Sequence, residues 1–193
     1  MFGSLTEAAS RRRVLVIAPF ALDGFAAVLS RLGRSPDGNA ANPEVAIVEF
    51  DDTGRKLGKV VRKKMVRSDS DWRRQLTAQQ YWSARRSTTD TPFTGTYYRL
   101  EAAGLFRCVC CGSALSSSKT KFDSGTGWPS YRAPMAAENI YMQADNSMFI
   151  ERVEALCRLC DAHLGHVFDD GPPPTGLRYC INESALRFVP STA

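Results

Sequence analysis

Two pairs of cysteines, each with two residues between its members, constrain the fold of this chain more than any other feature. Cys108 and Cys111 form the first pair and Cys157 and Cys160 the second, with 45 residues between the pairs. Two such knuckles supply four thiolates for a tetrahedral zinc ion, which favours sulfur and four ligands. Gly112, directly after the first knuckle, suits a tight turn because glycine accepts positive φ. The spacing therefore predicts one structural Zn²⁺ per chain that joins strands far apart in sequence.

Two other interpretations of the cysteine pairs are considered. The pairs are also compatible with two redox-active dithiols, as in a general disulfide reductase, or with a zinc ribbon that binds nucleic acid without catalysis. Residues 1–92 hold 16 Lys and Arg against 10 Asp and Glu, whereas the motif-bearing remainder holds 9 against 10. A nucleic-acid-binding protein is expected to carry its positive charge on the folded, motif-bearing part. The charge distribution therefore argues against a nucleic-acid partner.

Residues 1–34 are predicted to be an export signal or a disordered basic leader. Ser10-Arg11-Arg12-Arg13 precedes a moderately apolar run, residues 14–29, which Asp23 and Gly24 interrupt and which is short for a membrane span. The segment resembles a twin-arginine signal, which predicts export to the periplasm of a bacterium. A mitochondrial-type presequence and a plain basic start are the alternatives, and the latter would leave the chain in the cytoplasm.

Residues 35–68 are predicted to form a linker and an N-terminal hairpin extension. The linker covers residues 35–43, which are rich in Pro, Gly, Asn and Ala. The hairpin joins residues 45–50 and 59–66, two β-branched runs on either side of Asp51-Asp52-Thr53-Gly54. Residues 69–193 are expected to form the main folded domain.

This main domain is predicted to be mainly β, with one short helix at its start. Ser70 or Asp71 is the expected N-cap of that helix, and apolar residues recur at helical spacing after it. Beyond Pro92 the sequence consists of short β-type runs separated by Gly, Pro, Ser and Asp. Such a pattern is typical of a compact antiparallel sandwich or barrel. The predicted strands are residues 96–100, 105–108, 140–142, 148–157 and 179–189.

Cys180 lies outside both knuckles, in a predicted strand. Arg178 and Asn182 stand two residues before and after it, which in a strand places all three side chains on one face. A cation at this distance is expected to lower the thiol pKa. The only two histidines, His163 and His166, follow the second knuckle, where a zinc-ligand role competes with a role near the thiol. A buried structural role for Cys180 and a solvated charge at Arg178 are the simpler alternatives.

Five motifs, in order and with the knuckles among them, resemble the B-type methionine sulfoxide reductases over about residues 69–188. The resemblance implies a β-fold of two antiparallel sheets and reduction of the R epimer of methionine sulfoxide in oxidised proteins. The motifs are Pro92-Phe93-Thr94-Gly95, residues 121–130 (KFDSGTGWPS), residues 163–168 (HLGHVF), Asp170-Gly171-Pro172 and residues 178–182 (RYCIN).

The resemblance also implies a role for each site residue. It makes Cys180 the nucleophile and places His163, His166 and Asn182 around the sulfoxide and an ordered water, with Arg178 beside the thiol. Trp128 and Phe168 become substrate-binding residues, with Trp128 as a wall of the methyl pocket; packing in the core is the alternative for Trp128. Attack on sulfur develops negative charge on the sulfoxide oxygen, and hydrogen-bond donors or an acid must stabilise that charge. The product is methionine and a sulfenic acid on Cys180.

Thr126 stands where many relatives carry a resolving cysteine. Cys110, between two predicted zinc ligands, is the only spare thiol, and a buried structural role is preferred over a role in recycling. Reduction by a thioredoxin-like protein or a small thiol is therefore expected, and the chain is expected to be monomeric. A remaining alternative is an inactive relative that only binds oxidised methionine. Such a protein would have no need of Cys180, which argues against this alternative.

Overall fold

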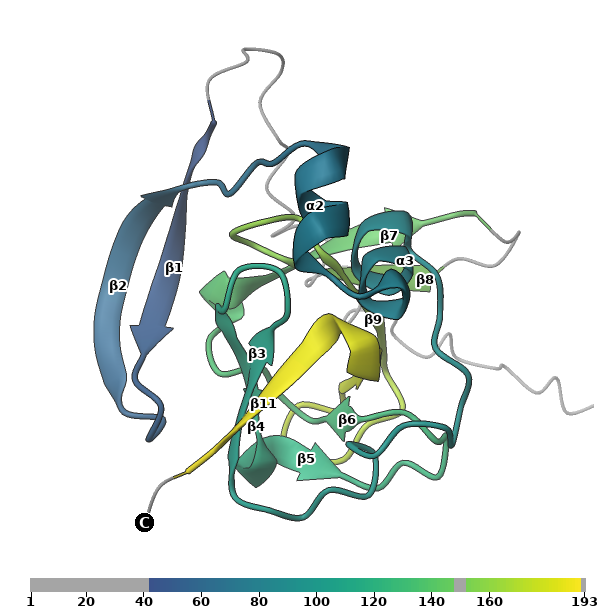
Figure 1. Ribbon diagram of the computed structural model, residues 1–193. Helices are drawn as coiled ribbons and strands as arrows, with labels where there is room; N and C mark the ends of the chain where they lie inside the picture. The colour runs from purple at the N-terminus through teal and green to yellow at the C-terminus, as the bar shows by residue number, and fades with distance from the viewer. Residues whose placement is uncertain (1–41, 148–151, 192–193) are drawn as a thin grey trace, which may run out of the picture. The chain divides into compact units, whose positions relative to one another are not determined.

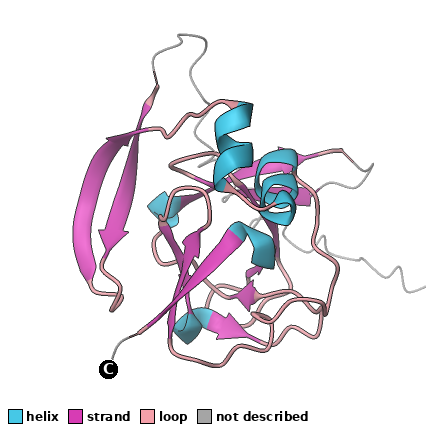
Figure 2. Ribbon diagram, in the orientation of Figure 1, coloured by secondary structure: helices cyan, strands magenta, loops and turns pink. Residues whose placement is uncertain are grey.

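The computed structural model describes residues 42–147 and 152–191 (Figure 1). The predicted export signal and residues 35–41 of the predicted linker lie outside the described residues, as do residues 148–151 of one predicted strand. Strands predominate, with two short helices (Figure 2). The mainly β fold expected from the sequence is confirmed.

The described strands form three antiparallel sheets. A two-stranded sheet pairs β1 with β2, a six-stranded sheet has the order β5-β6-β10-β9-β8-β7, and a three-stranded sheet has the order β11-β3-β4. The strands are β1 (Glu44–Phe50), β2 (Lys56–Lys63), β3 (Gly104–Cys108), β4 (Ala114–Ser117), β5 (Lys121–Phe122), β6 (Ser130–Tyr131), β7 (Ile140–Asp145), β8 (Arg152–Cys157), β9 (His163–Phe168), β10 (Arg178–Ile181) and β11 (Leu186–Pro190).

The core lies between the six-stranded and three-stranded sheets. Phe106 of β3 packs edge-on against Tyr131 of β6, with ring centroids 5.2 Å apart, and neither side chain is accessible to solvent. Tyr131 belongs to a cross-strand row with Tyr179, Val167 and Val153, all buried. Because side chains alternate across a strand, the neighbouring residues of each strand form a second row on the opposite face. That second row contains Cys180.

Two helices stand where one was predicted. α2 (Asp69–Gln75) and α3 (Ala78–Arg86) are separated at Leu76 and Thr77. Each begins with a capping box, in which Ser68 or Thr77 bonds to the third helical residue and receives a bond in return. The predicted N-cap at Ser70 or Asp71 is therefore wrong. Ser68 caps α2 because its hydroxyl accepts from the Asp71 backbone N–H, while the Asp71 carboxylate accepts from the Ser68 N–H.

The predicted hairpin is present, but its second strand is displaced. β2 begins at Lys56 and ends at Lys63, three residues earlier at each end than predicted. The chain leaves the hairpin at Lys64, whose N–H donates to the Pro43 carbonyl, and the Met65 N–H then donates to the Leu159 carbonyl at 2.7 Å. This second bond ties the end of the hairpin to the second cysteine knuckle.

A buried amide anchors the hairpin to the domain. The Asn139 side chain, in the 3₁₀ turn Ala137–Asn139, accepts from the Val48 N–H at 2.8 Å and donates to the Val48 carbonyl at 2.9 Å. It also donates to the Ala114 carbonyl at 2.8 Å. One side chain thus completes the backbone hydrogen bonds of β1 as a neighbouring strand would.

Two other strand predictions need correction, and some strands were not predicted. Residues 96–100 form turns, because the Glu183 carboxylate accepts from the N–H groups of Thr96 and Tyr97. The predicted strand 179–189 is interrupted by the 3₁₀ turn Glu183–Ala185, which separates β10 from β11. β9, which carries both histidines, was not predicted as a strand.

Within the described part of the chain, no helix combines the length and the apolar character needed to cross a membrane.

Candidate active site and metal centre

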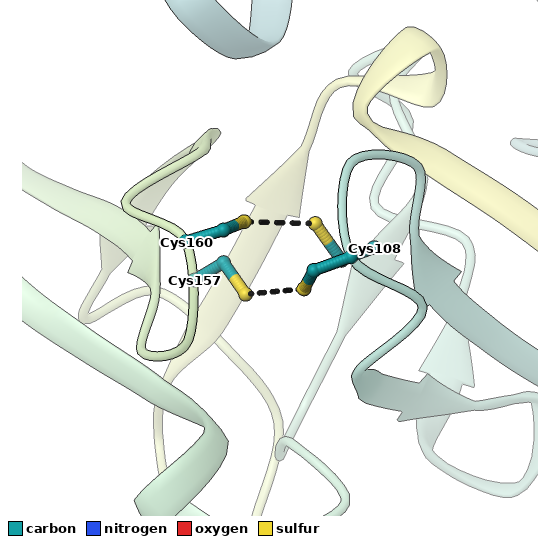
Figure 3. A group of neighbouring side chains, drawn as sticks. Cys108, Cys157 and Cys160 are labelled. Atoms are coloured by element: carbon teal, nitrogen blue, oxygen red, sulfur yellow. Dashed lines mark hydrogen bonds between the residues drawn. The ribbon is translucent and has the colours of Figure 1, made fainter. Parts of the chain in front are cut away.

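The four paired cysteines converge on one point. The Sγ atoms of Cys108, Cys111, Cys157 and Cys160 all lie within 4.8 Å of one another. Two close approaches join different knuckles: Cys108 to Cys160 at 3.6 Å and Cys111 to Cys157 at 3.5 Å (Figure 3). A tetrahedral ion with metal–sulfur bonds of about 2.3 Å separates its ligand sulfurs by roughly 3.8 Å. The cluster can therefore hold a metal ion, and the convergence of all four thiols on one point favours a single metal site over two separate redox dithiols.

Each knuckle is a tight turn closed by a residue with positive φ. Gly112 has φ of +77° and its N–H donates to the Cys108 carbonyl at 2.8 Å. Asp161 has φ of +54° and its N–H donates to the Cys157 carbonyl at 2.9 Å. These bonds close the tight turn of each knuckle. The turn at Gly112 is the one that the sequence predicted.

Side chains from outside the two knuckles hold them in place. Arg85 donates to the Cys160 carbonyl and Gln75 to the Cys110 carbonyl, each at 2.7 Å. Lys64, at the end of the hairpin, forms an ion pair with Asp161. Cys110 itself is 3% exposed. Its burial supports a structural role.

Cys180 lies in the middle of the six-stranded sheet, on β10 between β6 and β9. In the register of the sheet it stands opposite Ser130 on one side and His166 on the other, and His166 stands opposite Glu154 of β8. These four residues form the row on the face opposite the core. Cys180 is half-buried, in contrast to the buried Cys108, Cys157 and Cys160.

A β-bulge brings the two histidines together. Three residues apart in a regular strand, His163 and His166 would point to opposite faces. Ala155 of β8 pairs with Gly165 of β9, but the next residue, Leu156, pairs with His163. Leu164 is therefore the extra residue of a β-bulge. The two imidazole rings therefore lie on one side, with centroids 5.5 Å apart. The sequence did not show this bulge.

Gly165, between the two histidines, permits the close approach of β10. A Cβ atom at this position would lie 2.1 Å from the Cys180 carbonyl oxygen, and the φ of Gly165 is +148°. Both observations require glycine. The Asn182 N–H donates to the Leu164 carbonyl at 2.7 Å, which completes the attachment of the chain after Cys180.

Each histidine has its own carboxylate. His163 Nδ1 lies 2.6 Å from Glu154, and His166 Nε2 lies 2.9 Å from Asp145. Asp145 also pairs with Arg152. Burial lowers the pKa of His166 below its ordinary value, against the opposing effect of the Asp145 hydrogen bond. Burial therefore favours the neutral form of the His166 imidazole.

Arg178 is on the same face as Cys180, as predicted, and is held rigidly. It forms two hydrogen bonds with the Asp170 carboxylate, at 2.7 and 2.8 Å, and its guanidinium lies 4.2 Å from the centre of the Phe168 ring. Arg178 lowers the pKa of the Cys180 thiol, as the sequence predicted, but it does not set the direction of the net shift. Burial raises the pKa of Cys180 and outweighs the opposing effects of Arg178 and of hydrogen bonds to Thr126 and Ser130.

Asp90 links Trp128 to Asn182, although the two are far apart in sequence. The Trp128 Nε1–H donates to the Asp90 carbonyl at 2.8 Å, and the Asn182 amide oxygen accepts from the Asp90 N–H at 2.9 Å. The Asp90 carboxylate accepts from the N–H and hydroxyl of Ser184. A cavity of about 400 Å³ borders Trp128 and Asp90 but is not lined by Cys180 or either histidine.

Sequence reasoning missed three acidic residues that position the site: Asp90, Asp145 and Glu154. An acidic residue in a surface strand or loop carries no local signal of its partner. Only the pairing of β8 with β9 and of β7 with β8 brings Glu154 and Asp145 to the histidines.

Comparison with known proteins identifies the family. The SelR domain matches residues 76–190. Peptide methionine sulfoxide reductase MsrB of Hahella chejuensis is 55% identical over 125 residues, which cover 65% of this chain and 90% of that protein. Methanosarcina mazei MsrB is 45% identical over 130 residues (67% and 93%). The chloroplastic peptide methionine sulfoxide reductase B1 of Oryza sativa is 52% identical over 121 residues (62% and 56%).

The chain therefore belongs to the B-type peptide methionine sulfoxide reductase family, a family of oxidoreductases. The resemblance drawn from the sequence motifs is confirmed. The hairpin β1–β2 lies before the matched SelR domain.

Proposed function

We propose that this chain reduces the R epimer of peptide-bound methionine sulfoxide to methionine, with Cys180 as the attacking thiol. The observation that carries the proposal is the separation of the six cysteines. Four form the cluster and Cys110 is buried beside it, whereas Cys180 stands half-buried outside the cluster, among histidine, arginine and hydroxyl side chains.

The proposed step transfers one oxygen atom. The Cys180 sulfur attacks the sulfoxide group. An S–O bond forms on Cys180, and the S–O bond of the substrate breaks. Methionine leaves with its sulfur reduced, and Cys180 is oxidised to a sulfenic acid. The proton of the thiol ends on the oxygen of that sulfenic acid. Because burial raises the pKa of Cys180, the thiol is protonated at neutral pH, and a base must accept its proton during the attack.

The residues around Cys180 suit this chemistry. The rings of His163 and His166 lie 5.5 Å apart, and His166 stands opposite Cys180 in the register, so this pair is proposed to carry the proton to the sulfoxide oxygen. The Asp90 bridge holds Trp128 and Asn182, which form the substrate wall and a hydrogen-bond partner for the oxygen. Phe168, stacked on Arg178, completes the apolar surface for the methyl group.

The four-cysteine cluster is proposed to hold one structural Zn²⁺. Four thiolates saturate a tetrahedral ion, so the metal stabilises the fold and takes no substrate. A histidine ligand is not needed, because His163 and His166 have carboxylate partners instead.

Recycling of the sulfenic acid is proposed to depend on an external thiol, a thioredoxin-like protein or a small thiol. Thr126 occupies the position of the usual resolving cysteine and forms a hydrogen bond to Ser124. We further propose that the protein is a monomer and that residues 1–34 direct export to the periplasm; cell fractionation of the tagged chain and of a variant with Arg11, Arg12 and Arg13 replaced by Lys tests the second point.

A thiol-dependent assay on both epimers of a blocked methionine sulfoxide tests the activity. Wild type is expected to reduce the R epimer and not the S epimer, and Cys180→Ser to reduce neither. Cys110→Ser is the matched control and is expected to keep most of the activity. Without reductant, wild type should release one equivalent of methionine and carry a dimedone adduct on Cys180. If Cys180→Ser reduces the R epimer as well as wild type does, the proposal is wrong.

A further inference from the structure

The carboxylate of Glu154 has no part in the function proposed above, yet it makes a close contact with a site residue. It lies 2.6 Å from His163 Nδ1, and the side chains of His163 and Glu154 are 3% and 16% exposed. Hydrogen bonds between a carboxylate and an imidazole at this distance are among the strong ones in proteins. The contact fixes the His163 ring from the neighbouring strand β8.

The other ring nitrogen of His163 has no such partner. Nε2 is buried and makes no hydrogen bond with any described residue. His166 differs, because its Nε2 is already bonded to Asp145. A buried polar atom without a partner in the protein is open to a water, a ligand or a reacting group, and this one belongs to a residue of the candidate site. The two histidines therefore differ, because the unpartnered nitrogen of His163 is its buried Nε2.

We propose that Glu154 is a positioning residue for sulfoxide reduction, an inference that rests on the function proposed above. In this proposal the Glu154 carboxylate accepts a hydrogen bond from Nδ1–H, which places a ring proton of His163 on Nδ1. This leaves the lone pair on Nε2, where it accepts the proton of the Cys180 thiol as sulfur attacks. The same proton then passes from Nε2 to the transferred oxygen, and the ring returns to its neutral state.

The charge of Glu154 serves the intermediate stage of this transfer. While the proton is on Nε2, the ring is an imidazolium, and the neighbouring carboxylate offsets its positive charge. In serine hydrolases the equivalent carboxylate also fixes the tautomer, and its replacement by an amide lowers kcat by about 10⁴ because the imidazole adopts the wrong one. Proton transfer by a positioned side chain contributes roughly 10²–10⁴ to a rate.

Replacement of Glu154 by Gln tests the proposal in the full chain. The amide keeps the size of the side chain but can donate as well as accept, so the ring is no longer held in one tautomer. With dithiothreitol and the R epimer of blocked methionine sulfoxide, kcat is expected to fall by about 100-fold while KM stays within about twofold. Glu138→Gln is the matched control, because Glu138 is a half-buried glutamate paired with Lys59 away from the histidines, and it is expected to leave kcat unchanged.

A double-mutant cycle separates positioning from a general loss of structure. In a His163→Ala background, Glu154→Gln is expected to lower kcat by less than about twofold further, because the carboxylate acts through the ring. Effects that multiply independently would overturn the proposal, as would a Glu154→Gln variant with wild-type kcat.

Nitrogen-15 NMR of the histidine rings provides a readout that does not depend on activity. Wild-type His163, at a pH where its ring is neutral, is expected to carry its proton on Nδ1; a proton on Nε2 would overturn the inference even if Glu154→Gln failed to fold. If wild type does not reduce the sulfoxide at all, the proposed function fails, whereas the tautomer still decides whether Glu154 orders the ring.

Discussion

The four-cysteine cluster and the Cys180 site use the same side chain in opposite ways. In the cluster, tight turns aim four thiols at one point, and three of the four cysteines are at most 2% exposed. At the site, strand register places one half-buried thiol in a row with Ser130, His166 and Glu154, and its neighbours are hydrogen-bonding groups. The difference shows that position in the fold, rather than residue type, separates a metal-binding thiol from a thiol available for reaction.

The largest expected effect concerns the cluster. Cys157→Ser should remove one of four metal ligands and lower the free energy of unfolding by more than about 3 kcal/mol, since structural zinc contributes on the order of 10 kcal/mol in small domains. Thermal unfolding followed by circular dichroism, together with metal analysis, measures the effect. Cys110→Ser is the control and should retain the metal. A Cys157→Ser protein with full zinc content and wild-type Tm would contradict the assignment of the cluster.

A smaller effect is expected where the site depends on backbone contact. Gly165→Ala should destabilise the protein by about 3 kcal/mol, because strain at positive φ adds to overlap of the new Cβ with the Cys180 carbonyl. Gly58 has a similar φ, +143°, but nothing lies within 4 Å of a Cβ built there. Gly58→Ala should therefore cost only about 1 kcal/mol. Urea unfolding compares the two, and equal losses would show that the close approach of β10 to β9 does not matter.

The smallest effect concerns the ionisation of Cys180. Burial raises the thiol pKa and Arg178 opposes that rise, so loss of the cation should raise the pKa further. The alkylation rate of Cys180 by iodoacetamide increases as pH rises through this pKa, and in Arg178→Gln the increase should occur at higher pH than in wild type. Mass spectrometry of the Cys180 peptide measures the rate. An unchanged or lower midpoint would show that Arg178 does not stabilise the thiolate.

The sequence by itself determined the chemistry available to this protein. The spacing of Cys108, Cys111, Cys157 and Cys160 specified a cluster, because a knuckle is a local turn whose geometry depends on adjacent residues. The order of motifs identified the family, and alternation in a short strand placed Arg178 on the face of Cys180.

Only the tertiary structure decided how the site is completed. The bulge at Leu164, the carboxylates of Glu154 and Asp145 and the Asp90 bridge all depend on pairing between strands that are distant or shifted in register. The sign of the Cys180 pKa shift was likewise beyond the sequence. A neighbouring cation can be read from the order of residues, whereas burial depends on how the whole chain packs around the thiol.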